Sequence, residues 1–221
     1  MFDHSVHQAF KTAEETLEHA FQPALQSTAR EPIFLLEVYA GTHSPLVEAV
    51  RKLGRKAIRF SRMDGDLSTP EGRRKLWKIV DECQPEHIWV APECGPWSGW
   101  SHLNQQKSLA LFDKITKDQA DQLQHIRLCA SLCRYQADRK RHFHLEQPLG
   151  SSMSKTDEFQ SILKLTDCAI FDMCRFGLKI PGTRKFLKKS SKVFTTSSDV
   201  VADLHGEKCL QDHEHQLIEG Q

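Results

Sequence analysis

Short apolar runs alternate with longer amphipathic segments through most of the chain. The clearest run, "IFLLEVYAG", has the composition of a strand that is buried on both faces of a parallel sheet. Strands are predicted at residues 33–41, 56–61, 87–92, 141–148, 169–177 and 192–197. Helices are predicted at residues 44–54, 66–83, 115–138 and 157–165. This alternation predicts an α/β domain with a mostly parallel sheet and flanking helices.

The first residues are predicted to form a separate element. Residues 4–25 carry apolar side chains on one helical face, at Val6, Phe10, Ala13, Leu17 and Phe21. The polar stretch "STAREP" then predicts a linker. We therefore divide the chain into an amphipathic helix with its linker (1–30), a catalytic-type α/β domain (31–198) and a tail that contains Cys and His (199–221).

Composition narrows the class of protein. With 221 residues, 39% of them hydrophobic and 27% charged, the chain is long enough for one large domain. The formal net charge of +1 gives no global field, so any contact with nucleic acid needs a local basic patch. No apolar run reaches the roughly 18 residues of a membrane helix, and the first residues do not resemble a signal peptide. The seven scattered cysteines predict reduced thiols, so we expect a soluble intracellular protein, nuclear if the source is eukaryotic.

Unusual residues gather at three predicted strand ends, where ligands bind in open α/β sheets. In "LLEVYAGTHS", the small residues Ala40 and Gly41 allow a ligand to approach the backbone between strand and helix. Glu37 is costly to bury unpaired and needs a partner, such as backbone N–H groups or a cationic ligand. The stretch is not G-x-G-x-x-G, so no dinucleotide is indicated. A tight turn is the alternative interpretation.

The other two strand ends carry a thiol and a carboxyl group. Cys94 lies in "APECGPWS", where Pro92 and Pro96 stiffen both sides of the loop, and it is a candidate nucleophile. Glu146 ends "HFHLEQP" before a proline, and desolvation there favours the protonated form that a proton donor requires. Each residue has an ordinary alternative, which is an incidental buried cysteine for Cys94 and a helix cap or ion-pair partner for Glu146.

Taken together and in this order, "E-V-Y-A-G", "P-E-C-G-P-W-S" and "L-E-Q-P" resemble motifs of the cytosine-C5 DNA methyltransferases. The S-adenosylmethionine loop of that family reads like D-L-F-A-G, its nucleophile loop like P-P-C-Q-P-F-S and its acid motif like E-N-V. The resemblance covers residues 33–197, and the cysteine loop is its most specific part. It implies a Rossmann-like methyltransferase fold that uses S-adenosylmethionine and acts on cytosine C5 in DNA, with RNA left open.

The resemblance also assigns roles to single residues. It implies Cys94 as the nucleophile, Glu146 as the proton donor to N3 of the base, and Arg184 as a base or phosphate contact. "DGDL" matches the G-D-I motif of the family, whose acid faces the adenine, and a further acid there is the candidate for the ribose hydroxyls. The implied cofactor-binding residues are Glu37, Tyr39, Ala40, Gly41, Asp64, Asp66 and Pro92.

Elementary chemistry favours the same arrangement. C5 of cytosine is a poor nucleophile, and a thiolate that adds at C6 makes C5 enamine-like, with help from an acid that protonates N3. The methyl donor must lie within reach, which places it at the neighbouring strand end. A base inside a duplex is inaccessible, so the substrate is either a flipped base or a single strand.

The chain also departs from the family. Only one helix lies between the second and third predicted strands, and Gln147 and Pro148 replace the Asn-Val pair after the acid. No target-recognition segment follows residue 197, so a separate recognition chain or a larger polyprotein is a candidate partner. Two alternatives stay open. One is a degenerate methyltransferase-fold module, derived from a mobile element, that binds nucleic acid without turnover. The other is a cysteine hydrolase that uses Cys94 with a histidine such as His144.

Metal and phosphate contacts are also predicted. Near the end of the chain, "DLHGEKCLQDHEHQLIEG" offers zinc ligands at Cys209, His213 and His215, with His205 as a further candidate. The spacing is not a standard zinc motif, and a solvated tail is the alternative. Among three basic clusters, "RKFLKKSSK" is the best candidate for a phosphate contact. "SGWSHLNQQKS" is predicted to be a polar, mobile flap over the substrate.

Overall fold

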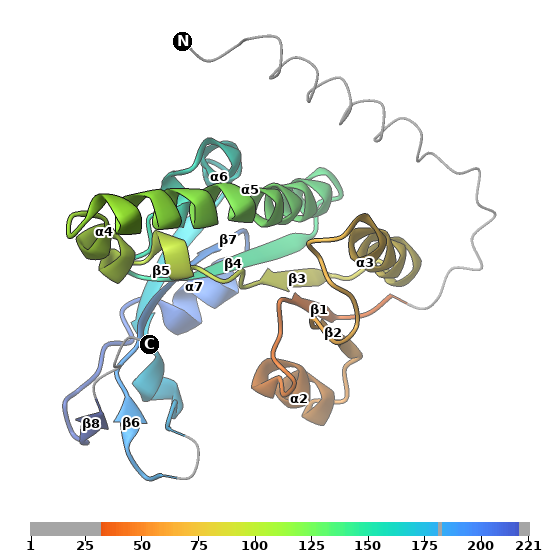
Figure 1. Cartoon of the computed structure of the whole chain (residues 1–221). Coiled ribbons are helices and arrows are strands. Elements are labelled where there is room, and N and C mark those ends of the chain that lie inside the picture. The colour runs from red at the N-terminus through yellow and green to blue at the C-terminus, as the bar shows by residue number, and fades with distance from the viewer. Residues whose placement is uncertain (1–31, 181–182, 217–221) are drawn as a thin grey trace. The chain divides into compact units, whose positions relative to one another are not determined.

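The computed structural model describes residues 32–180 and 183–216 (Figure 1). The chain divides into two compact units, Met1–Arg30 and Glu31–Gln221, and all described residues belong to the second. The helix predicted over residues 4–25 lies outside the described residues. None of the described helices is both long enough and apolar enough to cross a membrane.

Six strands of the described chain form one mixed sheet (Figure 1). They are β1 (Leu35–Val38), β2 (Ala57–Phe60), β3 (His87–Val90), β4 (His142–Pro148), β5 (Asp167–Asp172) and β7 (Ser190–Thr195). The order across the sheet is β2-β1-β3-β4-β7-β5. The first four of these run parallel, and β7 lies antiparallel between β4 and β5. The predicted α/β class with a mostly parallel sheet is confirmed.

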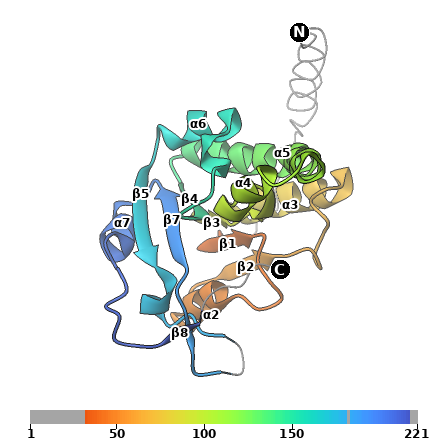
Figure 2. The same ribbon diagram turned by 60° about the vertical axis from the view of Figure 1, so that its left-hand side comes forward.

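Helices cover both faces of this sheet, as Figures 1 and 2 show. The α-helices are α2 (Pro45–Lys52), α3 (Pro70–Cys83), α4 (Gly99–Gln105), α5 (Leu109–Asp138), α6 (Asp157–Leu163) and α7 (Ser198–Leu204). The 3₁₀ helices are η1 (Gly95–Trp97), η2 (Met153–Lys155) and η3 (Met173–Phe176). The layer of α3, α5 and α6 lies on one face, and α2 and α7 lie on the other. A small separate sheet pairs β6 (Phe186–Leu187) with β8 (His215–Gln216) in parallel.

The side chains of β1 explain why the sheet needs two helical layers. Leu36 and Val38 are fully buried in the main core, together with Leu76 of α3 and Ile126 of α5. Leu35 points to the other face and packs with the apolar residues of α2. Burying each such side chain stabilises the fold by roughly 1.5–3 kcal/mol. A strand that is apolar on both faces therefore requires a cover on both.

Local signals set the ends of the predicted helices. Thr69 is the N-cap of α3, where its hydroxyl accepts a hydrogen bond from the Gly72 N–H at 3.1 Å, and Pro70 follows at the first helical position. Ser44 caps α2 in the same way. Gly54 follows α2 with φ of 74°, a left-handed conformation that ends helices. These signals act within a few residues, which is why the sequence predicts both helices.

The polar segment after the cysteine loop, for which the sequence predicted no helix or strand, is helical. It forms α4, whose N-cap Ser98 accepts a hydrogen bond from the Ser101 N–H at 3.2 Å. The following helix was predicted from residue 115 but begins at Leu109, because Ser108 caps it there. Serines in a polar stretch are typical of loops as well as of helix caps, so composition alone does not predict these helix starts.

The last predicted elements are also rearranged. The strand predicted over residues 169–177 ends at Asp172, and the chain turns into η3. The following tail packs against the edge of the sheet, where the Asp172 N–H donates to the Glu207 carbonyl at 2.8 Å and the Gly206 N–H donates to the Ile170 carbonyl at 3.0 Å. Residues of the tail up to 216 therefore belong to the same compact unit as the sheet.

Candidate functional site

The three sequence motifs meet at one edge of the sheet. Val38 of β1 is aligned with Val90 of β3, and Val90 is aligned with Leu145 of β4. The chain leaves β1 for β2 on one side and returns to β3 on the other, so the carboxyl ends of β1 and β3 flank a topological switch point. Ligands bind at such switch points in open α/β sheets. The predicted convergence of the motifs is therefore present in the fold.

Cys94 follows β3 as the residue before η1. Its carbonyl accepts a hydrogen bond from the Trp97 N–H at 2.9 Å, which fixes the loop, and its side chain is half-buried against the main core. Burial raises the pKa of the Cys94 thiol, the charge of Lys189 opposes this shift, and the charge of Glu146 adds to it. In the free protein the thiol is therefore mostly protonated at neutral pH.

Glu146 lies near the end of β4 and faces a cation. The Lys189 ammonium is 3.5 Å from Glu146 Oε1, and the Glu146 side chain is only 13% exposed. This buried oxygen has no hydrogen-bond partner among the described residues. Lys189 is the cation that faces the Glu146 carboxyl group in the described structure. An acceptor without a hydrogen-bond donor fits a ligand that brings an N–H group.

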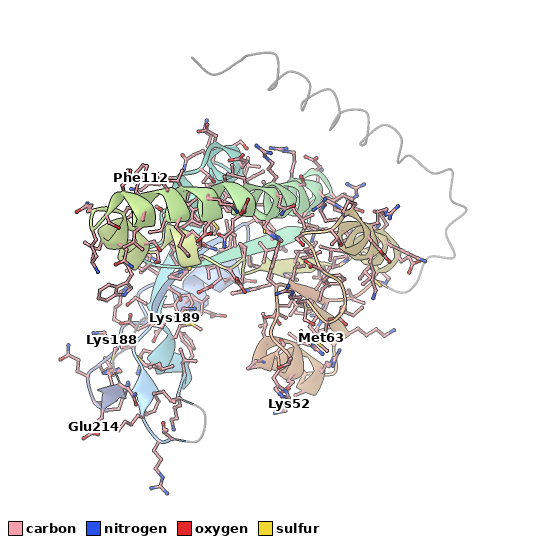
Figure 3. All side chains as sticks on the ribbon, viewed as in Figure 1. Lys52, Met63, Phe112, Lys188, Lys189 and Glu214 are labelled. Carbon is pink, nitrogen blue, oxygen red and sulfur yellow. The ribbon has the colours of Figure 1, made fainter. Side chains whose placement is uncertain are left out.

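Lys189 is a site residue that the sequence analysis missed. It precedes β7, and because β7 runs antiparallel to β4, its first residues lie beside the end of β4, with Ser191 paired to Pro148. Figure 3 shows Lys188 and Lys189 together where the chain passes from β6 to β7. The basic cluster "RKFLKKSSK" was the available signal, but the direction of β7 selects which of its lysines reaches Glu146.

Arg184, predicted as a base or phosphate contact, is not part of this group. It is exposed in the segment before β6 and forms no hydrogen bond or ion pair with Cys94 or Glu146 in the described chain. Lys189 is the basic residue beside Glu146, and the contact of Arg184 with a base or phosphate stays a prediction. Arg184 precedes β6 and Lys189 follows it, so the two residues lie at opposite ends of this strand.

Pro92 and Gln147 connect the cysteine loop to the end of β4. Gln147 is fully buried, and its side-chain amide donates to the Pro92 carbonyl at 3.4 Å. Its oxygen accepts from the Ser151 hydroxyl at 3.0 Å. Gln147 replaces the asparagine of the family motif, and here it holds the cysteine loop and the Glu146 strand together.

Glu37 has a structural partner. The Ser44 hydroxyl, which also caps α2, donates to the Glu37 carboxylate. Burial raises the pKa of Glu37, and the hydrogen bond from Ser44 and the charge of Arg59 partly offset this shift. Glu37, which the sequence indicated as needing a partner, therefore has partners within the protein. Through Ser44 it is linked to the turn after β1.

The turn after β1 is conformationally unusual. Tyr39 has φ of 65°, which is uncommon for an aromatic residue and is often found at functional sites. Its hydroxyl is 3.0 Å from Nδ1 of His125 on α5, and burial raises its pKa. The small residues Ala40 and Gly41 follow, and Gly41 is exposed at the edge of the sheet.

Asp64 and Asp66 lie in the turns after β2. Burial opposes the charged form of Asp64, but the N–H and hydroxyl of Ser61 bind Oδ2 at 2.9 and 2.7 Å and lower its pKa. The hydroxyl and N–H of Ser68 likewise lower the pKa of Asp66. Both acids are thus ionised at neutral pH, and the half-buried Asp66 is able to accept a further hydrogen bond.

If S-adenosylmethionine binds at the switch point, it would lie along an open edge of the sheet and not in a deep cavity. Two hollows of about 460 and 480 Å³ lie elsewhere, one around Ile33 and Ala57 and the other around Trp97 and Thr156. At the edge itself, the small turn after Tyr39 leaves the backbone accessible. The ionised acids of the neighbouring turns suit the cationic, donor-rich cofactor.

The predicted zinc ligands come together with a fourth side chain. Cys209, His213 and His215 lie with Cys174 of η3 so that one ligand atom from each falls within 4.8 Å of all the others. His205 ends α7 and does not belong to this group. Cys174 was missed because it lies far from the tail in sequence and only the packing of the tail on β5 brings it close.

The structure gives no support to a cysteine hydrolase that uses His144. This side chain is only 2% exposed, and its two ring nitrogens lie 3.0 Å from His87 Nδ1 and 2.8 Å from Thr195 Oγ1. Burial lowers the pKa of His144 to about 3. A neutral imidazole that is held in this way lies within the sheet and does not contact Cys94.

Scans of the chain against protein-family models and against curated proteins find no match. Function is therefore inferred from the residues, their geometry and the resemblance of the motifs.

Proposed function

We propose that the protein is an S-adenosylmethionine-dependent methyltransferase that acts on C5 of cytosine in DNA through a covalent adduct to Cys94. The observation that carries the proposal is the convergence of Cys94, Glu146 and Lys189 at one sheet edge beside the switch point. A thiol, a carboxylate and an ammonium in electrostatic contact are a stronger indication of chemistry than any single short motif.

Cys94 and Glu146 have complementary roles in this reaction. The Cys94 thiolate forms a bond to C6 of the base, while N3 takes a proton from the Glu146 carboxyl group. The electron pair that reaches C5 would then form the bond to the methyl group, as the methyl–sulfur bond of S-adenosylmethionine breaks and S-adenosylhomocysteine leaves. Loss of the C5 proton to solvent, return of the N3 proton to Glu146 and breakage of the S–C6 bond restore the free thiolate and release 5-methylcytosine.

Lys189 would assist the transfer of a proton from Cys94. Burial favours the protonated thiol, and transfer of its proton to Glu146 would produce the nucleophile and the acid in one step. Lys189 stabilises the thiolate because its charge lowers the thiol pKa. We therefore expect Lys189 to contact the reacting groups directly.

S-adenosylmethionine supplies an electrophilic methyl group when it is bound. The turn of Tyr39, Ala40 and Gly41 would hold it at the switch point, with Asp66 near the adenine. Glu37 would support this turn indirectly, by accepting a hydrogen bond from the Ser44 hydroxyl.

A catalytically degenerate module that binds nucleic acid is the second candidate. It is favoured by the raised pKa of Cys94, which leaves little thiolate in the free protein. In either case, DNA is the proposed partner, with RNA as the alternative substrate, and a separate recognition chain or a larger polyprotein would supply sequence selection.

The test is covalent trapping with oligonucleotides that carry 5-fluorocytosine. Fluorine at C5 cannot leave as a proton, so the reaction stops at the thioether and gives a denaturant-resistant band when S-adenosylmethionine is present. Cys94→Ser should abolish the band, and Glu146→Gln should slow its formation by roughly 10²–10⁴. Cys168→Ser, which changes another partly buried thiol, is the matched control and should form the adduct normally.

The outcomes separate the two candidates. An adduct that survives Cys94→Ser would refute the assigned nucleophile. Calorimetry with S-adenosylmethionine supplies an independent result, because binding without an adduct on any tested DNA or RNA contradicts the covalent mechanism. Absence of cofactor binding at millimolar concentration, together with retained DNA binding, would favour the degenerate module.

A further inference from the structure

We propose that Cys174, Cys209, His213 and His215 bind one structural Zn²⁺, which fastens the β6–β8 pair to the edge of the main sheet. One ligand atom from each side chain lies within 4.8 Å of all the others. Cys209 Sγ is 3.7 Å from His213 Nε2 and 3.3 Å from His215 Nε2. A tetrahedral zinc site with ordinary Zn–S and Zn–N bonds has ligand–ligand distances of about 3.3–3.8 Å. The two distances from Cys209 to the histidines fall in this range, and the other ligand atoms lie within 4.8 Å of one another.

The surroundings of the ligands match those of a metal site. Asp212 Oδ1 is 2.7 Å from His213 Nδ1, which leaves Nε2 of the same ring directed at the sulfur. A carboxylate behind a ligating imidazole is a common feature of zinc sites. The Gln211 N–H lies 3.3 Å from Cys209 Sγ, as a donor to a thiolate does. These contacts fix the ligands before any metal arrives.

Zn²⁺ is the cation that this donor set suits best. Two sulfurs and two imidazoles are typical of structural zinc, and no oxygen ligand belongs to this group among the residues that the structure describes, which disfavours Mg²⁺ and Ca²⁺. A disulfide between Cys174 and Cys209 is the competing chemistry. A disulfide would not explain why the Nε2 atoms of both histidines lie close to Cys209 Sγ.

The small β6–β8 sheet needs such a fastening. Each strand has two residues, and a sheet of this size does not stabilise itself in water. One of the proposed zinc ligands, His215, lies in β8 and is paired with Phe186 of β6. The Phe186 ring also packs on His213, with ring centroids 4.1 Å apart. A bound metal would supply the folding free energy that apolar burial does not.

The site also lies next to the residues that position Lys189. The N–H of Met173, which precedes the ligand Cys174, donates to the Lys189 carbonyl at 2.9 Å. Asp172 accepts from the Ser190 hydroxyl and from the Cys209 N–H. The metal would thus hold the segment that presents Lys189 to Glu146. Zinc binding itself does not depend on the proposed function.

Metal analysis of the full chain, purified without added metal, tests the proposal. We expect about one equivalent of zinc by mass spectrometry. Replacement with Co²⁺ should give the visible absorption and the thiolate charge-transfer band of a tetrahedral site with two sulfurs. Cys174→Ser and His213→Ala should each lower the zinc content well below one equivalent and change the cobalt spectrum, while the controls Cys168→Ser and His205→Ala should leave both unchanged. A cobalt spectrum that is the same in Cys174→Ser, or an intact disulfide with no zinc, would overturn the site.

The link to Lys189 has its own measurement. Removal of zinc should lower the thermal midpoint by about 5–15 °C. It should also slow the alkylation of Cys94 by about two- to tenfold, followed by peptide mass spectrometry so that the freed ligand thiols are counted separately. An unchanged Cys94 rate with zinc fully removed would show that the metal does not position Lys189. Neither result requires methyltransferase activity, so failure of the proposed function would not affect them.

Discussion

The surroundings of Cys94 shift the pKa of its thiol in opposite directions. Burial raises its pKa, the ammonium of Lys189 lowers it, and the carboxylate of Glu146 raises it again. The two charged residues are themselves an ion pair at 3.5 Å. Changing either one therefore shifts the thiolate fraction in a predictable direction, which gives a test that requires no substrate.

We predict that Lys189→Met slows and Glu146→Gln speeds the reaction of Cys94 with iodoacetamide, each by about two- to tenfold at pH 7.5. The wild-type rate should rise about tenfold per pH unit between pH 7 and 8, because the raised pKa keeps the thiol protonated over this range. The measurement is alkylation of the Cys94 peptide by mass spectrometry, with Lys188→Met as the control. Changes in the same direction for both variants would contradict the assigned electrostatics.

His144 predicts a loss of stability in acid. Its pKa is lowered from 6.5 in the unfolded chain to about 3 in the fold, so the unfolded state binds the proton more tightly. Stability is therefore complete above pH 6.5 and falls as the pH drops towards 3. Between pH 7 and pH 5 this one group lowers the free energy of unfolding by about 2 kcal/mol.

Urea unfolding of the wild type and of His144→Gln at pH 7 and pH 5 measures this effect. The variant is less stable at pH 7 because hydrogen bonds to His87 and Thr195 are altered, but it should lose less on acidification. The difference between the two pH responses isolates His144 from other groups. Equal responses in both proteins would show that the buried imidazole is not the source.

At the scale of elements, α3 positions the turn that carries Asp66. A Cβ atom on Gly72, in the first turn of α3, would lie 2.0 Å from the Asp66 carbonyl oxygen. The Thr69 hydroxyl donates to the same carbonyl at 2.7 Å, so the turn and the helix start form one packed unit. The absence of a side chain at Gly72 is what permits this approach.

Gly72→Ala is expected to destabilise the fold by about 1–3 kcal/mol, because the backbone of the turn has to move away from α3. It should also weaken S-adenosylmethionine binding more than its effect on stability explains, since Asp66 moves with the turn. Thermal unfolding and calorimetry measure the two effects. Gly150→Ala, where nothing lies within 4 Å of the new Cβ, is the matched control. Normal cofactor affinity in folded Gly72→Ala would separate Asp66 from the cofactor site.

At the scale of the whole molecule, charge is balanced, and basic side chains are concentrated locally. The net charge of +1 gives little general attraction for DNA. The segment from Arg184 to Lys189 is an exception: Figure 3 shows its residues Lys188 and Lys189 close together, and Lys189 pairs with Glu146. Exposed cations beside a candidate base-binding site are suited to phosphate contacts that set the position of the nucleic acid.

We expect the triple variant Arg184→Ala, Lys185→Ala, Lys188→Ala to weaken binding to every DNA sequence alike. The slope of log affinity against log salt concentration should become smaller by about 2–3, roughly one unit for each lost phosphate contact. Fluorescence anisotropy over a salt series measures it. The control Lys114→Ala, Lys117→Ala removes lysines that pair with Asp118 and Asp121 on α5. A similar loss of slope in the control would contradict a localised contact.

The sequence by itself determined the α/β class, the starts of several helices and the positions of two candidate site residues. Caps such as Ser44 and Thr69 act within one helical turn, so they predict where α2 and α3 begin. Cys94 and Glu146 follow apolar runs, and the carboxyl ends of parallel strands necessarily lie at the same edge. Local pattern was therefore sufficient for the α/β class and for this pair.

Only the tertiary structure decided which other residues join them. The antiparallel direction of β7 brings Lys189 to Glu146, and the packing of the tail on β5 brings Cys174 to Cys209. Strand direction and tail packing depend on hydrogen bonds and burial summed over the whole sheet, and no local pattern of residues encodes them. For this reason the sequence did not indicate that Lys189 lies beside Glu146 or that Cys174 lies beside the three predicted zinc ligands.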